Sequence, residues 1–347
     1  MRTRSWIVTA AALLGLPACG PPRQRSLHVL DVGGVVSSLA FAPDGRTLAC
    51  ALRDRIVLVD TETGTRIREV GPVPEQFLVI AFVRDKLLSA GVAGYARLWD
   101  VTRGVELDRF MAGAVRGLAV SPEGRWLVTT QGVAGGDTTA EGIDTITIWD
   151  LERGRRSPPL TGSPGPADAL AVNSEGLVAV GRYRMAIDIF EAQTGKSLRS
   201  LRGEGADFQG IKSVAFSPDA PHWLAAGDNA GYITLWDASD GRSVARFRPH
   251  LGLFLAPTPS VMATSFALHG LLAEAGSQGA AGLWRFEMPS GHGQAIATFS
   301  DHSSWEKFGD TNLRNEIYAL AVNRDGSAIA TSHRDHSIRM WRGSGLH

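Results

Sequence analysis

Apolar and polar residues alternate over short stretches along most of this chain, and the 3.6-residue period of a helix is absent. Val35–Phe41 alternates in this way, as expected of a half-buried β-strand. Short turns of proline, an acidic residue and glycine follow such stretches, as at Pro43-Asp44-Gly45. Proline fixes φ, the acidic side chain binds its own backbone and glycine accepts positive φ, which suits tight hairpins. The pattern predicts an all-β protein built from antiparallel hairpins.

The predicted strands fall into seven copies of one unit. Each full copy has a strand, a turn, two more strands, a glycine turn and a short fourth strand. The third strand ends on tryptophan in five copies and on Val59 or Phe190 in two degenerate ones; the tryptophans are Trp99, Trp149, Trp236, Trp284 and Trp341. Successive copies lie 40 to 57 residues apart, a period that indicates stacked supersecondary units.

This order of motifs, from Ser26 to Trp341, resembles the WD-repeat family. The resemblance implies a seven-bladed β-propeller of four-stranded antiparallel blades around a channel, occupying residues 26–347. The last copy has only three strands, whereas Leu27–Asp31 is a strand without a unit. The resemblance therefore implies that this N-terminal strand completes the last blade, which removes an exposed sheet edge.

The chain departs from the family pattern in its buried polar groups. Only the last copy has a set that matches the buried polar network of the family, formed by Asp301-His302, Thr331, Asp335 and Trp341. We therefore expect apolar packing to hold the other blades, with each tryptophan wedged between neighbouring sheets.

The N-terminal residues carry a targeting pattern. Arg2 and Arg4 precede Trp6–Leu16, an uncharged stretch of 11 residues that is too short to span a bilayer as a helix. The pattern predicts a signal peptide over residues 1–18. Leu16-Pro17-Ala18-Cys19 resembles the cleavage site of bacterial lipoproteins, which implies acylation of Cys19; the alternative is ordinary cleavage after Ala18.

Residues 19–25 are predicted to form a short, stiff tether. The resemblance to a lipoprotein cleavage site implies an exported protein that a lipid anchors to a membrane and that faces the periplasm or the cell exterior. Gly20 is not the aspartate that retains lipoproteins at the inner membrane of enteric bacteria, so an outer membrane is favoured where one exists.

Composition narrows the classes of partner. The 35 Lys and Arg residues balance the 35 Asp and Glu residues, so the chain has no net positive charge that would favour binding to nucleic acid. If Cys19 is acylated, the chain has no second cysteine with which Cys50 could form a disulfide. Cys50 lies within the apolar stretch Leu48–Leu52 on a predicted inner strand, which predicts that it is a small core residue.

One cluster near the C-terminus contains possible metal ligands. His333, Asp335 and His336 lie in a predicted turn of the last blade, and His302 lies in the loop that enters this blade. Imidazoles and carboxylates of this kind bind zinc. The alternative, implied by the family resemblance, is that Asp335 and His302 hydrogen-bond to each other and brace the blade. We favour the alternative, and no metal, cofactor or catalytic residue is predicted.

Three insertions give the main functional signal. Residues 131–144, 248–259 and 300–316 lengthen connections that share one face of a propeller, and such insertions often mark a binding side. Trp305, Lys307, Phe308 and Phe254 are the candidate anchors for a partner; the alternative is that Trp305 and Phe308 cap their own loop. The resulting hypothesis is a non-enzymatic, membrane-tethered scaffold that binds a protein or peptide. The alternative is a periplasmic propeller that binds a ligand or metal, or an enzyme that uses the channel mouth.

Overall fold

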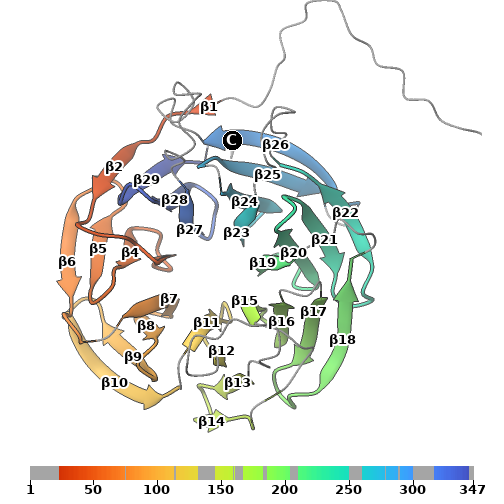
Figure 1. Cartoon of the computed structure of the whole chain (residues 1–347), viewed down its shortest axis with the longest axis horizontal. Coiled ribbons are helices and arrows are strands. Elements are labelled where there is room, and N and C mark those ends of the chain that lie inside the picture. The colour runs from red at the N-terminus through yellow and green to blue at the C-terminus, as the bar shows by residue number, and fades with distance from the viewer. Residues whose placement is uncertain are drawn as a thin grey trace, which may run out of the picture.

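The computed structural model is a closed ring of seven β-sheet blades (Figure 1). It describes residues 23–343 apart from 75, 113–114, 132–144, 159, 161–166, 183–185, 204–209, 250–259, 278, 288–289 and 300–315. Strands are counted from the channel outward in each blade. The all-β, seven-bladed fold predicted from the repeats is confirmed.

The blades follow one another in chain order. Blade 1 contains β3 (Ser38–Phe41), β4 (Thr47–Ala51), β5 (Ile56–Asp60) and β6 (Arg66–Val70). Blade 2 contains β7 (Phe77–Val83), β8 (Lys86–Gly91), β9 (Tyr95–Asp100) and β10 (Val105–Met111). Blade 3 contains β11 (Val115–Val120), β12 (Trp126–Gln131), β13 (Thr145–Asp150) and β14 (Arg155–Arg156). Blade 4 contains β15 (Ala167–Val172), β16 (Leu177–Arg182), β17 (Ala186–Glu191) and β18 (Ser197–Arg202).

The remaining blades repeat this order. Blade 5 contains β19 (Ile211–Phe216), β20 (Trp223–Asp228), β21 (Ile233–Asp237) and β22 (Ser243–Phe247). Blade 6 contains β23 (Val261–Phe266), β24 (Leu271–Gly276), β25 (Ala281–Glu287) and β26 (His292–Phe299). Blade 7 contains β27 (Ile317–Val322), β28 (Ala328–His333) and β29 (Ser337–Arg342), with β2 (His28–Asp31) as its outer strand.

Strand β2 closes the ring. It pairs antiparallel with β29, from His28 opposite Met340 to Asp31 opposite Ser337. The N–H of Leu27 also donates to the carbonyl of Met340 at 2.7 Å. The predicted completion of the last blade by the N-terminal strand is therefore confirmed.

A second N-terminal strand was not predicted. Strand β1 (Arg23–Gln24) pairs in parallel with β26, so that blade 6 has a fifth strand at its outer edge. The end of the predicted tether is therefore docked on the propeller.

The hydrophobic core consists of seven clusters, one between each pair of neighbouring blades. Trp99, Trp236 and Trp341 are buried in these clusters, and Trp149 and Trp284 pack against them half-buried. The predicted wedging of the tryptophans between sheets is confirmed. Truncating a buried tryptophan to alanine is expected to cost about 3–5 kcal/mol.

Cys50 lies in the cluster between blades 7 and 1 and has no exposed surface. Burial raises the pKa of its thiol, since the thiolate has no access to water. The prediction that Cys50 is a core residue is confirmed.

Buried polar contacts occur in more blades than the sequence analysis predicted. The indole N–H of Trp99 donates to Ser89 Oγ at 2.8 Å, and that of Trp149 donates to Thr129 Oγ1 at 3.4 Å. Blade 4 contains a buried ion pair between Arg182 and Asp188. The family network was expected only in the last blade, with mainly apolar packing elsewhere; these pairs in blades 2, 3 and 4 add to the apolar cores between the blades.

The aspartate that follows tryptophan in the repeat holds the next turn. Asp100 Oδ1 accepts hydrogen bonds from the Thr102 hydroxyl at 2.6 Å and from the backbone N–H of Thr102 and Arg103. The Thr102 hydroxyl, followed by the backbone donors, holds the pKa of Asp100 below its ordinary value. Gly104 then takes a positive φ of 73°, which is why glycine ends this turn.

Among the described residues no helix is long and apolar enough to cross a membrane.

Candidate functional site

The two faces of the ring carry different connections. The second and fourth strands of an antiparallel blade run in the same direction, so their ends share one face. The three insertions start after β12, β22 and β26, which are second or fourth strands, so they share this face, here named the insertion face. The opposite face, named the short-turn face, carries the turns between first and second and between third and fourth strands.

The predicted partner anchors belong to the insertions. Trp305, Lys307, Phe308 and Phe254 lie outside the described residues, as does His302. Their role in binding stays a prediction.

The possible metal ligands of blade 7 are directed to different partners. His333 ends β28 rather than lying in the turn, is 1% exposed, and places Nε2 2.7 Å from Thr331 Oγ1. Asp335 instead accepts hydrogen bonds from Ser337 at 2.5 Å and Arg339 at 3.0 Å. The placement of His333 in a turn was wrong because β28 extends further than the polar sequence suggested. Among the described residues no group of three His, Cys, Asp or Glu side chains is arranged to hold a metal ion.

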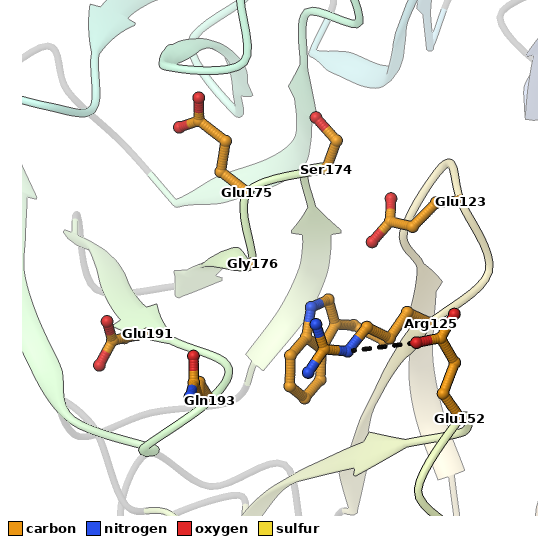
Figure 2. Close-up of a pocket in the computed structure, with 9 residues that line it drawn as sticks. Glu123, Arg125, Glu152, Ser174, Glu175, Gly176, Glu191 and Gln193 are labelled. Carbon is orange, nitrogen blue, oxygen red and sulfur yellow. Dashed lines mark ion pairs between the residues drawn. The ribbon is translucent and has the colours of Figure 1, made fainter.

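The described chain has a pocket between blades 3 and 4 on the short-turn face (Figure 2). The pocket, here named the acidic pocket, has a volume of about 330 Å³. Its walls come from the turns of both blades, and its lining contains four glutamates, Glu123, Glu152, Glu175 and Glu191. Both carboxylate oxygens of Glu123 are buried and accept no hydrogen bond from the described residues.

Arginines balance part of this charge. Arg125 places its guanidinium 4.3 Å from the centre of the Trp126 ring and pairs with Asp150 at 3.1 Å. Burial raises the pKa of Asp150, but the Arg125 hydrogen bond and a backbone N–H outweigh it and hold that pKa below its ordinary value. Arg84, from blade 2, pairs with Glu152 at 3.0 Å. These contacts leave the carboxylates of Glu123 and of blade 4 in excess.

A second cavity adjoins the acidic pocket toward the channel. This apolar pocket has a volume of about 210 Å³ and is lined mainly at the ends of the first strands of blades 3 to 6. Its apolar lining consists of Val120, Pro122, Val172, Ala215, Phe216, Pro218 and Phe266, and Asn173, Ser174, Ser217 and Ser265 complete the lining with polar groups. Ser174 lines both cavities. The turn residues Pro122 and Glu123 are neighbours in sequence, and one lines each pocket.

Neither pocket was predicted from the sequence. The signal was the acidic residue of the first turn in adjacent copies, Glu123 and Glu175, but it was interpreted only as turn chemistry. The glutamates converge because blades 3 and 4 are neighbours, which gives a surface charge pattern that no single repeat contains.

Comparisons with known proteins identify the repeat. The family model described as WD domain, G-beta repeat, matches residues 24–59, 195–237 and 293–342. Telomerase protein component 1 of Rattus norvegicus is 25% identical over 327 residues, which is 92% of this chain and 11% of that protein. Guanine nucleotide-binding protein subunit beta of Arabidopsis thaliana is 23% identical over 213 residues, covering 58% of this chain and 52% of the relative.

The fold is shared with a solved structure titled Crystal Structure of Mitotic Checkpoint Complex. The TM-score is 0.73 and the identity 16%, with 99% of both chains covered. This likeness shows the propeller fold alone. The chain spans about a tenth of the telomerase component and about half of the G-protein subunit that it matches.

Proposed function

We propose that this chain, a seven-bladed β-propeller that carries WD40 repeats, is a non-enzymatic scaffold that binds a protein or peptide partner. Propellers of this kind are typically protein-interaction scaffolds, although fold alone does not fix function. The proposal depends chiefly on one observation. All three long insertions join strand ends on the insertion face, whereas the described turns on the short-turn face are short.

The insertion face is the proposed docking side for this partner. Loops that a rigid framework presents are common places for binding residues. Trp305 and Phe308 supply aromatic anchors on the longest insertion, with Lys307 between them and Phe254 on the neighbouring insertion. The equal numbers of acidic and basic residues favour a protein over a nucleic acid as the partner.

A lipid anchor at Cys19 is proposed to hold the scaffold at a membrane, with the outer membrane as its address where one exists. Strand β1 supports this arrangement because it docks Arg23 beside Thr298 at the outer edge of blade 6. Four Cα-to-Cα steps lead from Arg23 back to Cys19, so the anchor reaches at most about 14 Å from that edge. Blades 3 and 4 lie across the ring from β1 (Figure 1).

The partner hypothesis is tested with two double variants of the full chain. Wild type, Trp305→Ala/Phe308→Ala and Asp240→Ala/Arg242→Ala are used to purify the partner from detergent-solubilised membranes. Asp240 and Arg242 form an exposed pair on the short-turn face and serve as the matched control. We expect the first variant to lose the partner, since interface anchors typically contribute about 2 kcal/mol or more. Loss in the control variant alone would place the partner on the other face.

The anchor is tested by cell fractionation. Wild-type protein is expected in the membrane fraction and the Cys19→Ser variant in the soluble fraction, because a removed acyl chain leaves no insertion into the bilayer. Wild-type protein that is soluble and carries no lipid would contradict the anchor and leave the scaffold proposal standing.

A further inference from the structure

We infer that the acidic and apolar pockets of the short-turn face together bind a partner segment in which lysine or arginine adjoins a large apolar side chain. This is a second binding surface, on the face opposite the insertions. It extends the proposed scaffold function, because a propeller that binds on both faces joins two partners.

The cationic part of this preference comes from Glu123. Glu123 is a half-buried residue whose two carboxylate oxygens are buried and accept no hydrogen bond from the described residues. A buried carboxylate without donors is unfavourable, and a charged N–H donor from a ligand relieves it. Glu175 and Glu191 line the same pocket, while Arg125 is already engaged by Asp150. Charge complementarity therefore favours a cation over an anion.

The apolar part comes from the adjoining cavity. Phe216, Phe266 and the ring of Pro218 line a space of about 210 Å³, which suits one large apolar side chain. Ser174 lines both cavities, and Pro122 and Glu123 are consecutive. Consecutive Cα atoms lie about 3.8 Å apart, and side chains of an extended segment alternate between its two faces, so residues one or two positions apart in a short segment can fill the two pockets.

The turn between the pockets is held in place before any ligand binds. Asn173 Oδ1 accepts hydrogen bonds from the N–H of Glu175 at 3.0 Å and of Leu177 at 2.7 Å. Its Nδ2 donates to the carbonyl of Pro221 in blade 5 at 2.6 Å. A fixed turn lowers the conformational entropy lost on binding, which favours recognition of a short segment.

The experiment selects displayed random heptapeptides on the full chain and measures the selected peptides by fluorescence anisotropy. We expect lysine or arginine beside an apolar residue in the selected sequences. Glu123→Gln keeps the shape and removes the charge, and should weaken binding about tenfold or more, since a charged hydrogen bond is lost. Glu62→Gln, an exposed glutamate on the same face in blade 1, is the matched control and should bind like wild type.

Several results would overturn the inference. These are selected peptides without a basic residue, peptides that keep the cation but no apolar neighbour, and equal affinity of wild type and Glu123→Gln. If Glu123→Gln loses its circular dichroism spectrum, Glu175→Gln, with an exposed side chain, replaces it with the same expectation. Peptides weakened by Trp305→Ala/Phe308→Ala and not by the glutamate variants would belong to the insertion face. That result would refute the second surface and leave the proposed function intact.

Discussion

The buried ion pair of blade 4 allows the sharpest test of how this ring is held together. Arg182 ends β16 and Asp188 lies on the neighbouring strand β17, with Nε and Oδ2 2.9 Å apart. The two side chains are 0% and 6% exposed. Removing both charges from water is costly, and their mutual attraction offsets that cost only while both are present.

We expect Asp188→Ala to lower the free energy of unfolding by about 3–5 kcal/mol, because the buried Arg182 guanidinium then loses the Asp188 carboxylate. Arg182→Met is also expected to destabilise, since it leaves the carboxylate buried. The double variant Arg182→Met/Asp188→Leu removes both charges and keeps the volume apolar. It should be more stable than either single variant.

The assay is a double-mutant cycle from urea unfolding curves followed by circular dichroism. Asp240 and Arg242 provide the control, with atoms only 2.6 Å apart but side chains that are 44% and 76% exposed. That exposed pair should contribute no more than about 1 kcal/mol. Additive single variants at positions 182 and 188, or an equal loss from Asp240→Ala, would show that burial does not decide the strength of these pairs.

Three further predictions concern closure, pH and the thiol. Deleting residues 27–31 should lower the melting temperature or cause aggregation, because β29 becomes a bare edge; unchanged melting would refute closure by β2. Burial raises the pKa of Asp228 above 3.8, so its contribution to stability decreases as pH rises from 3.8 through the raised value. Urea titrations across that range should show a smaller decrease for Asp228→Asn. Cys50, fully buried, should react with a thiol reagent only in denaturant; prompt reaction in the folded protein would contradict its placement.

Local chemistry explains what the sequence could reveal about this fold. The turn at Pro43-Asp44-Gly45 and the tryptophans at the ends of third strands carry their roles within one repeat. The conformation follows from short-range rules: Gly45 takes a φ of 70°, as the turn requires. Closure by β2 was also predictable, since one missing strand and one extra strand are visible in the linear order.

Features that depend on neighbouring blades were not predictable in this way. Strand β1 pairs with β26 through backbone groups, and its Arg-Gln sequence has no apolar pattern to signal a strand. Arg182 is charged and ends a strand, where solvent exposure is the ordinary expectation, yet it is fully buried. The acidic pocket combines Glu123 of blade 3 with Glu175 of blade 4, and only the ring brings the two together.

The division of the ring into seven interblade cores separates stability from binding. Each core lies between sheets, so the connections at the ends of the strands vary in length with little effect on packing. The insertion face uses this freedom for long loops, whereas on the short-turn face hydrogen-bonded turns such as that of Asn173 fix the pockets. The two proposed surfaces should therefore differ in the kind of partner they bind. A surface of preformed pockets favours short segments of defined chemistry, and long insertions offer residues for a broader contact surface.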